Sequence, residues 1–150
     1  MKPFAKTLWL LLFCLLLPSH GGWAGEKPAF VVIVHRDNPL EKISADQLSR
    51  IFLKKVTQWD DGQEISPFDL SPSAEVRNKF SQDILRKTVS VVRAYWQRQV
   101  FAGRAVPPPE ISEQAEVVSQ VSGDPGAIAY VAGDFPLSNQ PVKILTVSQD

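Results

Sequence analysis

The sequence has little of what metal sites and nucleophilic enzymes require. It contains one cysteine and two histidines in 150 residues. An internal disulfide is therefore excluded, and a zinc site of cysteine and histidine lacks ligands. Basic and acidic residues number sixteen each, so net charge does not point to nucleic acid. With 44% hydrophobic and 21% charged residues, the composition is typical of one globular domain rather than of a disordered chain.

Long hydrophobic runs are missing too, except near the N-terminus. Residues 8–17 are ten consecutive apolar residues behind a basic start, about half of the roughly 20 that a membrane-spanning helix needs. Small residues at Gly22 and Ala24 match positions −3 and −1 of a cleavage site. This pattern predicts a signal peptide over residues 1–24, cleaved after Ala24. The alternative is a retained membrane anchor.

Cleavage at this point would change the composition. It would leave residues 25–150 as the mature domain and remove Cys14 together with Lys2 and Lys6. Fourteen of the sixteen basic residues would then face sixteen acidic ones, a formal charge of −2. No later segment is apolar over enough residues to span a bilayer. We therefore expect a periplasmic protein without a thiol and without a membrane span.

The remaining chain predicts one α/β domain. The run at 30–34 is β-branched and aromatic without alternation, as in a strand buried on both faces. Ser44 followed by Gln47 has the spacing of a helix capping box, and three prolines at 107–109 predict an extended linker. The other expected strands are 64–69, 127–131 and 142–147. Three further helices are expected. The first starts at Ser73 with an inward face of Val76, Phe80 and Ile84, and the second starts at Thr88 or Ser90 with an inward face of Val91, Val92, Tyr95, Trp96 and Val100. The third starts at Ser112 with an inward face of Ala115, Val118 and Val121.

Several motifs of the chain together resemble a known family. They are Asn-Pro at 38–39, Ile-Ser-Ala-Asp-Gln-Leu at 43–48, Ile-Phe-Leu-Lys-Lys-Val at 51–56, Trp-Asp-Asp-Gly at 59–62 and Pro-Gly-Ala-Ile-Ala-Tyr-Val at 125–131. In this order they resemble the second lobe of periplasmic phosphate-binding proteins, the type 2 substrate-binding proteins of ABC importers, and in particular a short single-lobe branch. The resemblance implies a single lobe with a mixed sheet flanked by helices, and it implies phosphate as ligand. Such proteins need no cofactor.

The phosphate loop of that family is only partly present. A Ser-Gly-Thr-Arg type sequence at a helix start falls on residues 74–77, where only Arg77 matches. A helix N-terminus with Arg77 and the hydroxyls of Ser71 and Ser73 could still hold an oxyanion. Glu75 in the first turn opposes this, because it repels an anion and competes for the same N–H groups. In the alternative reading, Ser73 only caps the helix and Glu75 only complements its dipole.

Other candidates are weaker. His35 is the only histidine left after cleavage, and Asp60 and Asp61 precede Gly62 in an ordinary turn sequence. Seven basic residues crowd into 77–104, whereas 105–150 holds six acidic residues and one lysine. The basic stretch could attract an anionic ligand or an acidic partner. Alternatively, the two stretches neutralise each other across the surface of one molecule.

These observations lead to one expected function and one alternative. We expect an exported domain that binds phosphate or a related oxyanion in connection with ABC-type phosphate transport. A second lobe or a membrane protein would then be the partner. The alternative is a periplasmic protein-interaction or sensory module that has lost the ligand loop. No catalytic or metal-binding constellation supports an enzyme, and nucleic acid is not an expected partner.

Overall fold

The computed structural model describes residues 27–149. The predicted leader, its cleavage after Ala24 and Cys14 lie outside the described residues. Within the described part, no helix is both long and apolar enough to cross a membrane.

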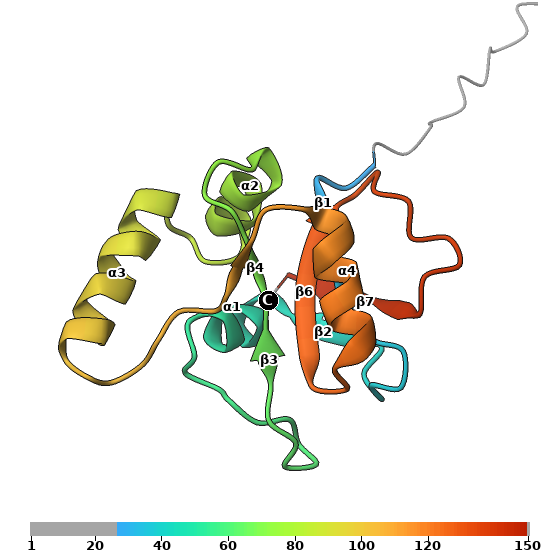
Figure 1. Ribbon diagram of the computed structural model, residues 1–150, viewed down its shortest axis with the longest axis horizontal. Coiled ribbons are helices and arrows are strands. Elements are labelled where there is room, and N and C mark those ends of the chain that lie inside the picture. The colour runs from blue at the N-terminus through green and yellow to red at the C-terminus, as the bar shows by residue number, and fades with distance from the viewer. Residues whose placement is uncertain (1–26, 150) are drawn as a thin grey trace, which may run out of the picture.

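A mixed five-stranded sheet forms the centre of the fold, in the order β2-β7-β1-β6-β3 (Figure 1). β1 is antiparallel to β6 and β7, while the short edge strands β2 and β3 run parallel to their neighbours. The predicted strand at 30–34 is thus confirmed as the central one, and Val32, Ile33 and Val34 are fully buried. The strands are β1 Phe30–His35, β2 Lys42–Ser44, β3 Ser66–Pro67, β6 Ala127–Ala132 and β7 Val142–Ser148.

A small second sheet pairs β4, Asp69–Leu70, with β5, Glu110–Ile111, in parallel. The sequence predicted a single strand over 64–69. That strand is in fact divided, because residues 66–67 pair with β6 and residues 69–70 pair with β5. The small sheet therefore brings the chain entering α2 beside the chain entering α4.

The described residues form four helices: α1 Ala45–Phe52, α2 Glu75–Asp83, α3 Val89–Phe101 and α4 Gln114–Gly123. The predicted caps of α1 and α3 are confirmed, since Ser44 Oγ accepts a hydrogen bond from the Gln47 amide and Thr88 Oγ1 from the Val91 amide. Two predicted starts were wrong by a residue or more. Ala74 occupies the N-cap position of α2 without a side-chain hydrogen bond, while the Ser73 hydroxyl bonds to Ser71. Glu113 rather than Ser112 precedes α4.

Aromatic rings fasten α1 and α2 to the sheet. Tyr130 of β6 stacks on Phe80 of α2 at a centroid distance of 3.8 Å and an interplanar angle of 2°. Phe52 of α1 meets Phe80 nearly edge-on at 4.8 Å, and Phe30 of β1 meets it at 5.4 Å. This cluster fixes α2, and with it the loop that precedes α2, against the centre of the sheet.

The motif residues around Trp59 tie a long loop to β6. The Trp59 indole Nε1 donates to the Gly126 carbonyl oxygen over 3.2 Å. Gly126 packs so closely against this loop that a Cβ atom there would lie 2.2 Å from the Glu64 carbonyl oxygen. A glycine is therefore required at this position, and the Trp59 hydrogen bond joins the Trp-Asp-Asp-Gly segment to the Pro-Gly pair at 125–126.

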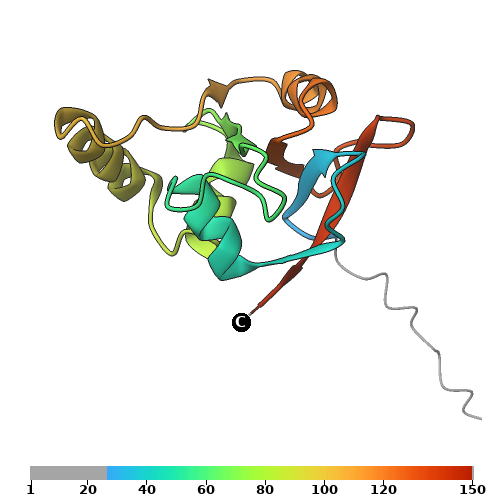
Figure 2. The same ribbon diagram turned by 90° about the horizontal axis from the view of Figure 1, so that it is seen from below.

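α3 stands at one end of the molecule, away from the sheet (Figures 1 and 2). Val92 and Trp96 are buried, and the Tyr95 hydroxyl donates to the Leu53 carbonyl oxygen over 3.1 Å. The predicted inward positions Val91 and Val100 are instead 47% and 51% exposed, because the helix packs through a single narrow face. Ala115 of α4 is likewise exposed rather than inward, and Val117 takes its place in the core.

Candidate functional site

The loop before α2 carries the two serines expected at an anion site. The hydroxyls of Ser71 and Ser73 lie 3.0 Å apart and bond to each other. The Ala74 amide donates to the Ser71 carbonyl oxygen, which turns the chain into α2. No side chain caps this helix. Within the described chain, the amides of Glu75 and Val76 donate no hydrogen bond, so α2 begins with free N–H groups.

Arg77 does not project toward these serines. Its side chain is almost fully buried, and Nη2 lies 2.9 Å from Asp69 Oδ2 in an ion pair. Nη1 donates to Ser81 Oγ over 2.9 Å, whereas Nε is buried without a hydrogen-bond partner. Among residues 27–149, no contact joins the Arg77 guanidinium to Ser71 or Ser73. The structure therefore brings the two serines together but keeps Arg77 inside the fold.

Asp69 is the centre of a buried polar cluster that sequence reasoning missed. Its Oδ1 accepts hydrogen bonds from the Leu70 amide and from the Tyr130 hydroxyl. Burial raises the pKa of the Asp69 carboxyl, although the Arg77 charge and the Tyr130 hydrogen bond act in the opposite direction. Burial, followed by the charge of Asp69, raises the pKa of Tyr130 well above 10. The only sequence signal was an aspartate between two apolar residues, Phe68 and Leu70, eight positions before a basic one.

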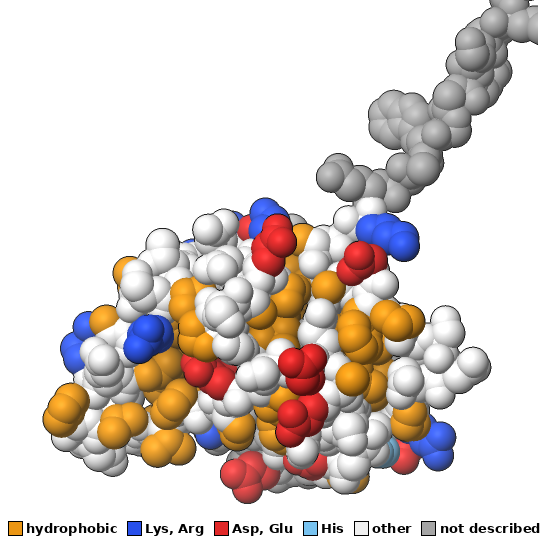
Figure 3. Space-filling view, turned by 45° about the horizontal axis from the view of Figure 1, so that its top comes forward, with side chains coloured by type: hydrophobic (Ala, Val, Ile, Leu, Met, Phe, Trp, Pro, Cys, Tyr) orange, Lys and Arg blue, Asp and Glu red, His pale blue; other side chains and the backbone are white. Residues whose placement is uncertain are grey.

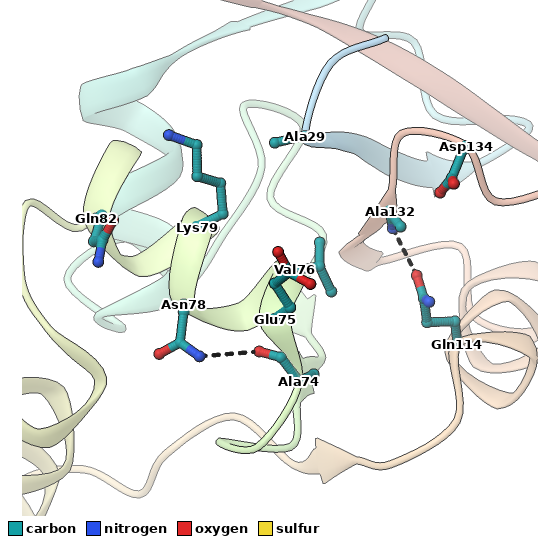
Figure 4. A pocket seen from close by; sticks show the side chains of 10 residues that line it. All are labelled: Ala29, Ala74, Glu75, Val76, Asn78, Lys79, Gln82, Gln114, Ala132 and Asp134. Carbon is teal, nitrogen blue, oxygen red and sulfur yellow. Dashed lines mark hydrogen bonds between the residues drawn. The ribbon is translucent and has the colours of Figure 1, made fainter.

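A cavity of about 740 Å³ opens between the start of α2 and the start of α4 (Figure 4). Gln114 Oε1 accepts a hydrogen bond from the Ala132 amide over 2.6 Å and closes one side. Glu75 and Asp134 give this cavity two carboxylates against the single cation Lys79. The full lining is Ala29, Ala74, Glu75, Val76, Asn78, Lys79, Gln82, Gln114, Ala132 and Asp134.

The other polar candidates form local structure. The Asp61 carboxylate accepts a hydrogen bond from the Gln63 amide, as expected in a turn. His35 Nδ1 accepts from the Asp37 amide at the end of β1. Residues 27–149 contain no group of three or more His, Cys, Asp or Glu side chains that could hold a metal ion.

Among residues 27–149, no ion pair joins the basic stretch to the acidic stretch. The ion pairs of the described chain are Arg77–Asp69, Lys79–Asp83, Lys143–Glu41 and the His35–Asp37 contact. None of them joins a basic residue of 77–104 to an acidic residue of 105–150. The idea that the two stretches neutralise each other by direct contact therefore finds no support among residues 27–149.

Known structures share this fold. A candidate phosphate ABC transporter substrate-binding protein from Clostridium perfringens, solved with bound phosphate, matches with a TM-score of 0.62 at 19% identity, over 79% of this chain and 44% of that one. An ABC-type phosphate transport receptor from Vibrio cholerae matches with a TM-score of 0.61 at 14% identity, over 79% of this chain and 46% of that one. PstS from Borrelia burgdorferi matches with a TM-score of 0.60 at 15% identity, over 80% of this chain and 47% of that one.

This chain spans less than half the length of each of these proteins. No curated protein matches it. The similarity thus confirms the predicted α/β fold, in which helices flank a mixed sheet, and agrees with a short single-lobe form. A family model for the PBP superfamily domain matches residues 27–147, nearly the whole described chain, and the chain therefore belongs to this family of periplasmic-binding-protein-like domains.

Proposed function

We propose that this chain is an exported lobe that binds phosphate or a related oxyanion weakly at the N-terminus of α2, in connection with ABC-type phosphate transport. The observation that carries the proposal is the uncapped start of α2, where the free amides of Glu75 and Val76 adjoin the cavity. Free amides and the positive end of the helix dipole favour an anion at such a place. That structural neighbours are named for phosphate transport supports the choice of phosphate.

Ser71 and Ser73 would supply hydroxyl donors from the loop. Their hydroxyls bond to each other, so each would have to exchange that bond for one to the ligand. Arg77 could donate to an anion only by giving up part of its contact with Asp69 or Ser81. Ser71, Ser73 and Arg77 thus remain the proposed ligand residues. The serines would donate directly, and Arg77 would donate only after releasing one of its present partners.

Low affinity follows from charge and from enclosure. Glu75 and Asp134 repel an anion in the cavity, and the Arg77 charge is already balanced by Asp69. Small-ligand sites gain affinity by enclosing most of the ligand, whereas a single lobe leaves one side of the ion in water. Tight binding would need a partner lobe, either from a second molecule or from a membrane protein of the transporter.

Calorimetry with phosphate and sulfate at low salt tests the proposal. We expect micromolar or weaker binding, which Glu75→Gln strengthens several-fold because it removes a repelling charge. Glu41→Gln, which lies beside Lys143 outside the cavity, should leave the affinity unchanged. Ser73→Ala should weaken binding more than Ser112→Ala. Nanomolar binding by a monomer would refute the low affinity, and equal effects of the two glutamate variants would indicate nonspecific electrostatics.

A second candidate function is the protein-interaction or sensory module. The two carboxylates in the cavity and the apolar side chains exposed on α3 favour it. If no oxyanion binds at millimolar concentration, while a pull-down from periplasmic extract recovers a stable partner, this function replaces the first. Fractionation and N-terminal sequencing of the exported protein, expected to start at Gly25, test the periplasmic location common to both.

A further inference from the structure

Exposed apolar side chains are concentrated on one part of the molecule. Five large hydrophobic residues among 27–149 stand out as exposed, and four of them lie between positions 91 and 106. Phe101 is 92% exposed and Val106 63%, while the fifth residue, Ile144, lies on β7. Figure 3 shows hydrophobic side chains gathered at the end of the molecule that α3 forms. Exposed apolar side chains that gather in one place are typical of an interaction site.

The outer face of α3 combines apolar and basic side chains. Val91, Ala94, Arg98 and Phe101 follow one another at spacings of three, four and three residues, which places them on one stripe of the helix. This stripe, here called the α3 stripe, faces away from the buried Val92 and Trp96. Arg98 is exposed and forms no ion pair within the described chain. The α3 stripe therefore suits a partner that is apolar and acidic.

The segment directly after α3 has that complementary character. Residues 104–109 form an extended connection to β5, here called the proline strap. Val106, Pro107 and Pro109 are exposed on it, whereas Pro108 is buried and anchors it. Glu110 and Glu113 follow, both exposed and both without an ion pair among residues 27–149. The proline strap thus begins at the exposed Arg104, presents apolar side chains along the rest of its length and is followed by two carboxylates.

We propose that the α3 stripe of one molecule binds the proline strap of a second copy, and the reverse, in a two-fold dimer. α3 ends at Phe101 and the strap begins three residues later, so the two surfaces are neighbours. A two-fold axis between them makes both contacts at once and closes the assembly. Phe101 and Val91 pack on Val106 and Pro107 of the other copy, and Arg98 meets the carboxylates of Glu110 and Glu113.

Charge complementarity selects a second copy over a membrane as the occupant. An anionic lipid surface would attract Arg98 and Arg104 but would repel Glu110 and Glu113, which lie next to the same apolar cluster. In the dimer Arg98 meets carboxylates of opposite charge, and each apolar surface covers the other. The dimer contacts involve no phosphate, so a failed test of the dimer would not affect the proposed phosphate binding, and the reverse.

Sedimentation velocity of the exported protein in phosphate-free buffer tests the dimer. We expect a dimer at about 100 μM, and Phe101→Asp should raise the dissociation constant by roughly thirtyfold or more, as removal of an interface anchor does. Ile144→Asp is the matched control, an equally drastic change at an exposed apolar side chain outside both surfaces, and should remain dimeric. Circular dichroism checks that both variants are folded. A wild-type protein that is monomeric at about 500 μM, or a Phe101→Asp variant that dimerises as wild type does, would overturn the proposal.

Charge reversal tests the pairing itself. Arg98→Glu alone and Glu113→Arg alone each place like charges at both contacts of the dimer, so each should weaken it about tenfold. An equimolar mixture of the two variants has opposite charges at both contacts and should recover the wild-type dimer. A mixture that remains as weak as its components would refute the contact between the α3 stripe and the proline strap.

Discussion

At the scale of single residues, the strongest constraint is the buried pair of Arg77 and Asp69. Removing one partner of such a pair leaves the other charge buried and uncompensated, which costs about 3–5 kcal/mol. Arg77→Leu should therefore lower the free energy of unfolding by about that amount at neutral pH, as measured by urea denaturation. Lys79→Leu breaks the exposed pair with Asp83 on the same helix and should change it by no more than about 0.5 kcal/mol. Equal effects would contradict the assignment of Arg77 to the core.

The cost of Arg77→Leu should also depend on pH. Burial raises the pKa of Asp69 above its ordinary 3.8, so between these two values the folded protein holds more protons than the unfolded one. Stability from this group is therefore present below pH 3.8 and is lost as the pH rises through the raised pKa. Without Arg77 the pKa of Asp69 rises further, so the stability deficit of the variant should grow as the pH rises above the ordinary aspartate value of 3.8. A stability deficit of Arg77→Leu that does not change with pH would contradict this cause. So would a pH-dependent deficit that remains in the double variant Arg77→Leu with Asp69→Asn.

Arg77 also shows why the candidate site was only partly predictable. Its position after a helix start matched a phosphate loop, but sequence cannot tell whether a long side chain turns outward to a ligand or inward to a carboxylate. The Arg77 side chain turns inward because it pairs with Asp69, which in turn is hydrogen-bonded to Tyr130. These two residues are 8 and 53 positions away from Arg77 along the chain. Such a contact depends on tertiary packing and leaves no local pattern. Ser71 and Ser73, by contrast, lie close together in the sequence, and their hydroxyls bond to each other in the loop before α2.

At the scale of elements, helix ends controlled by a side chain can be tested directly. Ser44→Ala removes the hydroxyl that accepts the Gln47 amide at the start of α1 and should cost about 1 kcal/mol of stability. Ser44→Asp should keep most of it, because a carboxylate accepts the same bond. Ser73→Ala is the matched control and should change stability by less than about 0.5 kcal/mol, since Ser73 caps no helix. A loss at Ser73 as large as that at Ser44 would contradict these cap assignments.

Strands and helix caps that are encoded by neighbouring residues in the sequence were predicted well, whereas very short strands were not. The apolar runs of β1 and β6 and the cap of α1 stood out because each depends on neighbouring residues alone. β2, only three residues long, was not expected, and it forms because β7 lies beside it. The inward face of α3 was predicted too wide, since the pattern assumed a helix lying flat on a core. Val91 and Val100 remain exposed because α3 contacts the body through one narrow face.

At the scale of the whole molecule, the fold divides into a tightly packed sheet and a projecting helix. β1, β6 and β7 are joined by two antiparallel ladders in the centre, whereas α3 is held mainly by Val92, Trp96 and the Tyr95 hydroxyl. The local free energy of opening should reflect this difference. The absence of ion pairs between the basic and acidic stretches leaves α3 without electrostatic support from the described part of its own chain.

Hydrogen exchange can measure this division. Amides of α3 should exchange at least about a hundredfold faster than those of β6, because opening one face of a single helix exposes far less apolar surface than opening the sheet. The measurement belongs on the Phe101→Asp variant, in which the proposed dimer cannot cover α3. Amides of α4, which packs against β1 and β6, serve as the internal control and should exchange at a rate closer to that of the sheet. Protection of α3 equal to that of β6 would mean that α3 opens only with the whole domain, and the single-face packing would then underestimate how firmly it is held.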